Sequence, residues 1–147
     1  MVHFNEQAVI RRAEPEDLPA LSALFAACLR SEPGPYAPVE VEAALRFGAG
    51  RADAAFRARC GFIAHWLDQP VGSSAWSWLD PDGSCWESEA PPDAPEPVAL
   101  IRAVAASAAF PGRGLGRRML DAAIDDARIA GARSIALVAT LGSANFY

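Results

Sequence analysis

The sequence predicts an α/β fold with a mixed sheet, in which antiparallel strands come first and a β-α-β unit follows. Two aromatic and β-branched runs, residues 60–66 and 71–78, flank a short polar segment, which is typical of an antiparallel hairpin. Later, the apolar run 98–106 leads through a glycine-rich turn into a helical pattern, and a second apolar run covers residues 134–139. A strand, a helix and a strand in this order form a right-handed unit with parallel strands.

Composition indicates a single domain over residues 1–147. Hydrophobic residues make up 52% of the chain, enough for a core, and the net charge is −5. A negatively charged chain is not typical of nucleic-acid binders, and no apolar run reaches the ~18 residues that a membrane span needs. Cys28, Cys60 and Cys85 are odd in number and widely spaced, which favours neither a disulfide framework nor a zinc site. We therefore expect a cytoplasmic protein with no metal, no nucleic-acid partner and no membrane.

The N-terminal part is expected to hold one strand and two helices. Residues 8–11 are a short β-prone run. A helix should run from Pro15 to about Arg30, because Pro15 and the acidic pair after it suit a first helical turn. A proline-rich loop, residues 31–38, separates this helix from a second one at residues 39–47. The apolar residues of the first helix are Leu18, Leu21, Leu24, Phe25 and Cys28.

Residues 80–97 hold five prolines, six acidic residues and no Lys or Arg, and we interpret them as a long acidic, proline-rich loop. Long loops of this kind are uncommon and are either functional or disordered. Two interpretations stay open, a solvated loop or a negatively charged flap that attracts a cationic acceptor. The strand before this loop also leaves two roles for Trp76 and Trp78, core packing or the lining of an acceptor pocket.

The glycine-rich turn after residue 110 has the features of an anion-binding site. Glycines let the backbone come close to a ligand, and the amide groups of a following helix N-terminus attract phosphate. The helix should begin near Arg117 and end at Gly131, because apolar residues recur between them at helical spacing. The glycine spacing does not match the dinucleotide fingerprint, and the turn lacks the Lys-Ser/Thr of a P-loop. The residues of the turn that carry this interpretation are Gly112, Gly114 and Gly116, with Arg113, Arg117 and Arg118 adding positive charge.

The segment Pro111-Gly112-Arg113-Gly114-Leu115-Gly116 resembles the central Gln/Arg-x-x-Gly-x-Gly/Ala motif of the GNAT superfamily of acyl-CoA N-acyltransferases. Residues 10–18 resemble the opening strand and first helix of that family, residues 68–72 its hairpin, and residues 143–147 the segment with its Phe-Tyr pair. The resemblance implies a mixed sheet with helices on both faces and acetyl-CoA as the acyl donor. Two departures are Pro111 at the Gln/Arg position and the stop at Tyr147, where the family continues into one or two more strands. The chain is therefore expected to be truncated or to have its sheet completed by a partner.

The resemblance also implies residue roles. Backbone groups of the strand before the turn would bind the pantetheine arm and polarise the thioester carbonyl, and the turn would hold the diphosphate. An amine would attack the thioester directly in a ternary complex. Tyr147 would protonate the departing thiolate, and Glu87 is named as the base, with Glu89 and His65 as other candidates. The cofactor-binding residues implied are Val104, Ala105, Ala106, Pro111, Gly112, Arg113, Gly114, Leu115, Gly116 and Arg117.

Three functions stay open. The first is an N-acetyltransferase that acts on a primary amine of a small molecule or a peptide. The second is a non-catalytic acyl-CoA-binding or regulatory module, and the third is a phosphate- or nucleotide-binding domain unrelated to acyl transfer. The identity of the acceptor and the oligomeric state, a homodimer included, are not determined by the sequence.

Overall fold

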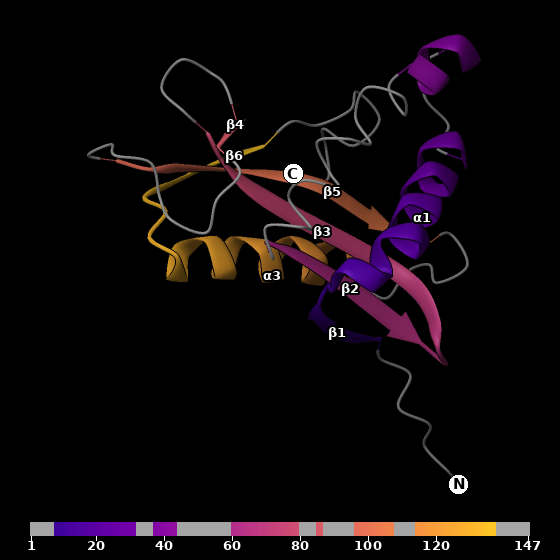
Figure 1. Ribbon diagram of the computed structural model, residues 1–147, viewed down its shortest axis with the longest axis horizontal. Helices are drawn as coiled ribbons and strands as arrows, with labels where there is room; N and C mark the ends of the chain where they lie inside the picture. The colour runs from indigo at the N-terminus through magenta and orange to yellow at the C-terminus, as the bar shows by residue number, and fades with distance from the viewer. Residues whose placement is uncertain are drawn as a thin grey trace, which may run out of the picture.

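The structure of the chain, a computed structural model, describes residues 8–31, 37–43, 60–79, 85–86, 96–107 and 114–137. Two main helices, α1 (Leu18–Ser31) and α3 (Leu115–Ile129), lie against a sheet (Figure 1). A short 3-10 helix, Pro15–Asp17, precedes α1, and residues 38–43 are also helical. The strands are β1 (Val9–Arg12), β2 (Gly61–Trp66), β3 (Gln69–Leu79), β4 (Cys85–Trp86), β5 (Val98–Ala106) and β6 (Ser134–Leu137).

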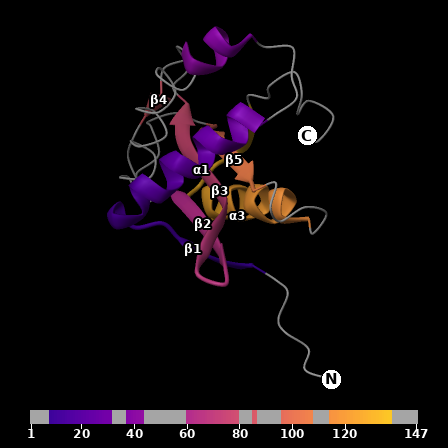
Figure 2. The ribbon, with the colours of Figure 1, turned by 90° about the vertical axis from the view of Figure 1, so that its right-hand side faces the viewer.

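The described strands form one sheet in the order β1-β2-β3-β5-β6, and the short β4 pairs with the end of β3. Strands β5 and β6 are parallel and are joined through α3, whereas the other pairs are antiparallel. Helix α1 packs on one face of the sheet and α3 on the other, as Figure 2 shows. The predicted α/β fold, with antiparallel strands, a β-α-β unit and helices on both faces, is therefore confirmed.

The core beneath α3 is centred on two tryptophans of β3. Trp76 and Trp78 are 2% and 0% exposed, and their rings meet edge to face with centroids 5.0 Å apart. They pack with Ala123 and Ala127, whose small side chains let α3 approach the sheet. Edge-to-face aromatic pairs stabilise a core beyond the area that they bury. Of the two roles considered for these tryptophans, core packing is confirmed.

The opposite face of the sheet packs against α1. Leu21 contacts a small cluster that includes Ile63 of β2 and Ala75 of β3. Leu21 and Leu24 are buried, as the helical spacing predicts, while the other apolar residues of the predicted stripe are only partly buried. The first half of α1 therefore holds the helix on the sheet.

The hairpin between β2 and β3 is tighter than predicted. It turns on two residues, Leu67 and Asp68, with φ of 49° and 62°. Two-residue turns with both φ values positive match the twist of antiparallel strands. The expected four-residue segment is therefore shortened, because Gln69 and Pro70 already belong to β3.

The β-α-β unit follows the predicted pattern closely. Strand β5 covers the predicted residues 98–106, and β6 covers residues 134–137 of the predicted run, whose remainder lies outside the described residues. Helix α3 starts at Leu115, ahead of the predicted Arg117, and ends before Gly131, whose φ of 114° suits a glycine. Local signals at both helix ends therefore agree with the fold.

The acidic segment 80–97 contains β4, a two-residue strand that the sequence did not predict. Apart from β4, Glu96 and Pro97, this segment lies outside the described residues, so its two interpretations stay predictions. In the part of the chain that the structure describes, no helix is long and apolar enough to cross a membrane.

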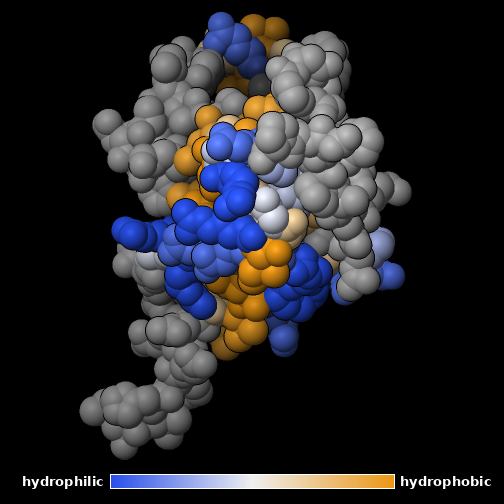
Figure 3. Space-filling model, turned by 90° about the vertical axis from the view of Figure 1, so that its left-hand side faces the viewer, coloured by the Kyte–Doolittle hydropathy of each residue, from blue (hydrophilic) through white to orange (hydrophobic). Residues whose placement is uncertain are grey.

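The side of the molecule on which α3 ends has a mixed surface. Figure 3 shows hydrophilic residues over much of the described surface there, with hydrophobic residues between them. Ile129, the last residue of α3, is 86% exposed. Single exposed apolar side chains are normal on protein surfaces. We therefore assign no binding role to this side.

Candidate cofactor-binding site

The predicted cofactor site lies at the edge of the sheet where β5 ends and α3 begins. Strand β5 ends at Ala106, and α3 starts at Leu115. Ligands of sheets with parallel strands bind outside the carboxyl ends of those strands, next to helix N-termini. The β-α-β unit therefore brings the end of β5 and the start of α3 to one place, as the sequence predicted.

The N-terminus of α3 presents backbone amide groups. Gly114 caps the helix with a left-handed backbone, φ 65°, which glycine adopts without strain. The first helical hydrogen bond joins Arg118 N–H to Gly114 O at 3.1 Å. The N–H groups of the three residues between them find no acceptor among the described residues, and no described residue lies within 4 Å of an added Cβ at Gly114. This helix end can therefore accept an anion, and the helix dipole favours one.

The two adjacent arginines differ in what they contact. Arg117 is 81% exposed and lies 3.9 Å from Asp121, one turn along α3. A pair of this kind contributes little at a surface, so Arg117 can turn toward a ligand. Arg118 instead donates from Nη2 to the backbone oxygen of Ala8 at 2.9 Å and so ties α3 to the residue before β1. One guanidinium nitrogen of Arg118 is therefore used in packing, and the expectation that its charge adds to the turn stays a prediction.

Strand β5 carries a β-bulge in its C-terminal half. Ser73 of β3 pairs with Ala105, but Ala75 pairs with Arg102, so that two residues of β5, Ala103 and Val104, lie opposite one residue of β3. Ala103 has a left-handed backbone with φ 52°. Bulges of this kind change the direction of the residues that follow them and are frequent near active sites.

The bulge sets which backbone groups of β5 face β6. Past the strand, Ser107 N–H donates to Val71 O at 2.7 Å, so Ser107 faces β3. Because backbone groups alternate between the two edges of a strand, those of Ala106 and Val104 face the opposite edge. Pairing with β6 ends at Ile101 and Leu137, and no described residue pairs with β5 beyond them on that edge. The Cys28 thiol of α1 donates to Ala106 O at 3.4 Å, but no described strand covers this edge at Val104 and Ala106, so it resembles a strand edge that an extended ligand can join.

Several predicted site residues lie outside the described residues. These residues are Pro111, Gly112 and Arg113 of the turn, and the candidates for acid–base roles Glu87, Glu89 and Tyr147. The third candidate base, His65, lies in β2 and pairs with Val9 and Pro70. Strand β3 separates it from β5, a distance of two strand spacings, or ~10 Å. The structure therefore does not bring His65 together with the end of β5.

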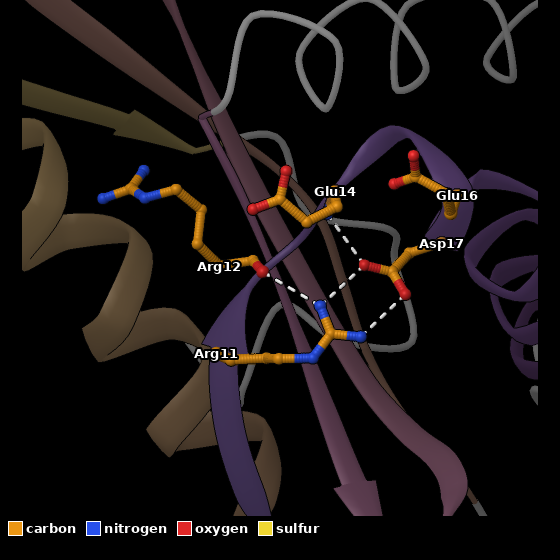
Figure 4. Close-up of a pocket in the computed structure, with 5 residues that line it drawn as sticks. All are labelled: Arg11, Arg12, Glu14, Glu16 and Asp17. Carbon is orange, nitrogen blue, oxygen red and sulfur yellow. Dashed lines mark hydrogen bonds and ion pairs between the residues drawn. The ribbon is translucent and has the colours of Figure 1, made fainter.

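A hollow lined by charged residues lies at the β1 edge of the sheet (Figure 4). Arg11 is level with Ala105 in the pairing register, but β2 and β3 lie between their strands, so the hollow is separate from the end of β5. In this hollow, the Arg11 guanidinium donates two hydrogen bonds to the Asp17 carboxylate, at 2.7 and 2.8 Å. The Glu14 backbone N–H donates a third to the same carboxylate at 2.7 Å. These bonds, those from Arg11 above all, lower the pKa of Asp17 to about 2. The charges of Arg11 and Asp17 neutralise each other. Their ion pair joins β1 to the 3-10 helix that precedes α1.

A second ion pair connects β1 to α3. Arg12 donates two hydrogen bonds to Asp126 of α3, at 2.6 and 3.1 Å, and the indole Nε1 of Trp76 donates a third at 2.8 Å. Burial raises the pKa of Asp126, but the bonds from Arg12 and Trp76 and the positive charge outweigh it, so the pKa lies below the ordinary 3.8. The guanidinium of Arg12 also lies 5.0 Å from the ring centroid of Phe62. This network orients α3, and sequence reasoning missed it because Arg12 and Asp126 are 114 positions apart.

Comparisons with known proteins agree with this geometry. The chain matches the family model described as acetyltransferase (GNAT) family over residues 19–147. A search of the curated proteins found no match. Three solved structures with the same fold are a GCN5-related N-acetyltransferase from Ralstonia eutropha JMP134 (14% identity, 96% of this chain and 89% of that chain, TM-score 0.70), a GNAT family acetyltransferase from Brucella melitensis in complex with acetyl-CoA (23%, 97% and 82%, 0.64) and an acetyltransferase from Trypanosoma brucei (19%, 96% and 89%, 0.61).

At these identities the solved structures establish the fold, whereas the family model covers most of the sequence itself. It includes α1, the sheet from β2 onward and the glycine-rich start of α3. The chain therefore belongs to the GNAT family of acetyltransferases.

Proposed function

We propose that this chain is an N-acetyltransferase, which transfers the acetyl group of acetyl-CoA to a primary amine by direct attack in a ternary complex. The observation that carries this proposal is the set of amide groups at the start of α3 that find no acceptor among the described residues, next to an edge of β5 that no described strand covers. Acetyl-CoA matches both features, because it joins a diphosphate to an extended amide-containing arm. The Brucella melitensis relative was solved with acetyl-CoA, which supports the same donor here.

In this proposal, the diphosphate of acetyl-CoA binds at the N-terminus of α3. The helix end carries roughly half a positive elementary charge, and the amides of Leu115, Gly116 and Arg117 supply hydrogen bonds. The exposed side chain of Arg117 adds a full charge nearby. Pro111, Gly112 and Arg113 are proposed to complete this site, by resemblance to the family motif.

The pantetheine arm would then run along β5. Its amide groups can pair with the backbone groups of Val104 and Ala106, which face the open edge, and Ala105 lies between them. A backbone N–H at this place would donate to the thioester carbonyl and to the oxyanion that forms from it. Donors of this kind typically contribute 10²–10³ in rate.

The chemistry follows from the two substrates. A neutral amine attacks the thioester carbonyl, the C–N bond forms, and the C–S bond breaks as CoA leaves as a thiolate. We propose that Tyr147 protonates this thiolate and that Glu87 removes the proton of the amine, whose pKa is ~10.4 when free. Both roles rest on the resemblance and on residue chemistry alone.

The test is a thiol-release assay with acetyl-CoA and a panel of amines that includes small amines, amino acids and peptides. Release of CoA that depends on an amine, with acetylated amine identified by mass spectrometry, would support the proposal. Acetyl-CoA binding by calorimetry without release for any amine would favour a non-catalytic acyl-CoA-binding module. Tighter binding of ATP than of acetyl-CoA would contradict both.

A further inference from the structure

We propose that Ser73 is a positioning residue for acetyl transfer, because its hydroxyl holds the bulge of β5 and thereby aims the backbone groups of Val104 at the thioester. The proposal rests on the proposed function. Ser73 Oγ donates to the backbone oxygen of Ala103 at 2.7 Å, and Ser73 is 1% exposed. The bond therefore lies at the β-bulge, where the pairing register between β3 and β5 shifts by one residue.

The bulge needs such support because Ala103 is strained. Its φ of 52° is in the left-handed region, where a Cβ clashes with the backbone. The other described non-glycine residues with positive φ, Leu67 and Asp68, form a tight hairpin turn, whereas Ala103 lies in the middle of a strand. Strained backbone persists only where surrounding contacts stabilise it. The hydrogen bond from Ser73 is a side-chain contact that acts directly on the Ala103 backbone oxygen.

The bulge changes which side of β5 each later residue faces. Ile101 and Val104 both pack toward the cluster under α3, although they are three positions apart and a regular strand repeats every two. Ala103 packs toward the opposite cluster, with Ala75 and Leu21. Without the bulge, Val104 would turn to the α1 face, and its backbone groups would leave the edge next to β6. The conformation at Ala103 therefore determines which amide is available to the acyl donor.

Two neighbouring serines provide matched controls. Ser74 and Ser77 lie in the same strand and are 0% and 4% exposed, and their hydroxyl oxygens have no hydrogen-bond partner among the described residues. Removing a buried hydroxyl without a partner costs little or is stabilising. A serine-to-alanine change at Ser77 thus removes the same group from the same strand without touching the bulge.

The experiment compares Ser73→Ala with Ser77→Ala in steady-state kinetics with acetyl-CoA and the best amine. Displacement of a reacting group by ~1 Å costs on the order of 100-fold, so we expect Ser73→Ala to lower kcat by roughly 10- to 100-fold. KM for acetyl-CoA should change much less than kcat, since the diphosphate contacts at α3 are intact. Ser77→Ala should keep the wild-type kcat. A wild-type kcat in Ser73→Ala, an equal loss in both variants, or a loss that falls on KM alone would overturn the proposal.

A second pair of variants tests the bulge itself. Glycine adopts the φ of residue 103 without strain, so Ala103→Gly should preserve the bulge even when Ser73 is absent. Ser73→Ala is then expected to lose less kcat in the Ala103→Gly background than in the wild type. Equal losses in the two backgrounds would show that Ser73 does not act through the bulge. If Ser73→Ala does not fold, Ser73→Cys, with its weaker donor, replaces it in both comparisons, and a wild-type kcat there counts against the proposal.

One readout is independent of turnover. Amide hydrogen exchange at Ala105 and Ser107, which pair with β3 just past the bulge, should be faster in Ser73→Ala than in Ser77→Ala, because the hydrogen bond that holds the bulge is lost. Equal exchange rates would refute the role of the Ser73 hydrogen bond in holding the bulge, even if the wild type proved inactive. Inactivity of the wild type with every amine would instead count against the proposed function, so the two failures are distinguishable.

Discussion

Replacing Gly114 with glutamate is expected to abolish the binding of acetyl-CoA, whereas the same replacement at Gly131 should leave it unchanged. The two glycines are matched, because both have positive φ, 65° and 114°, and no described residue lies within 4 Å of a Cβ added at either. They flank opposite ends of α3, whose 15 residues span ~22 Å. A residue with a Cβ in this left-handed backbone conformation costs ~1–2 kcal/mol of folding stability, and this cost is the same kind of effect in both variants.

The difference between the two variants is electrostatic. A carboxylate at Gly114 would lie roughly 5 Å from a diphosphate bound at the N-terminus of α3. At an effective dielectric constant of about 20, each pair of like charges costs about 3 kcal/mol, which lowers affinity on the order of 100-fold. A carboxylate at Gly131 is ~22 Å away, well beyond the Debye length of ~8 Å, so its repulsion is screened.

The assay is isothermal titration calorimetry with acetyl-CoA, with thermal unfolding to verify that each variant is folded. Gly114→Gln, which has similar bulk without the charge, separates steric blocking from repulsion and is expected to bind between the wild type and Gly114→Glu. Wild-type affinity in Gly114→Glu, or equal weakening in Gly131→Glu, would refute the placement of the diphosphate at α3.

Three further predictions follow from the ion pairs and from the proposed acid. Asp126→Ala should lower the free energy of unfolding in urea by about 2 kcal/mol, because it removes the acceptor of the buried Trp76 indole N–H together with the ion pair to Arg12. Asp125→Ala, at the exposed neighbour, should change it by less than ~0.5 kcal/mol, and equal losses would contradict the network. Since the pKa of Asp17 is lowered to about 2, its bond to Arg11 should stabilise the fold fully above pH ~5 and lose this effect as the pH falls through about 2. The difference in unfolding free energy between the wild type and Asp17→Asn, at most ~1 kcal/mol because Arg11 is 45% exposed, should therefore vanish near pH 2, and a difference that is constant with pH would argue against it. Tyr147→Phe should lower kcat by about 100-fold or more at unchanged affinity for acetyl-CoA, and an unaltered kcat would remove the phenol from the proposed mechanism.

The sequence by itself determined the elements whose signals are local. The apolar run 98–106 became β5 over its full length, and Gly131 marked the end of α3, whose start at Leu115 lies two residues before the predicted Arg117. Hydrophobic spacing and glycine conformation act over a few residues, so they can be interpreted without knowing the fold. The place of the candidate cofactor site followed from the same signals, because a strand, a turn and a helix in this order put the helix N-terminus at the carboxyl edge of the sheet.

Only the tertiary structure decided how distant side chains are used. Ser73 meets Ala103 across 30 positions, Arg118 meets Ala8 across 110, and Arg12 meets Asp126 across 114. No local pattern distinguishes Ser73 from the other buried serines of β3, or Arg118 from the exposed Arg117. Hydrogen bonds between elements depend on register and on the packing of α3 against the sheet, and these are set when the whole sheet forms. The bulge at Ala103, on which the proposed aim of the donor amide depends, therefore belongs to the tertiary structure and has no signature in the run of residues that carries it.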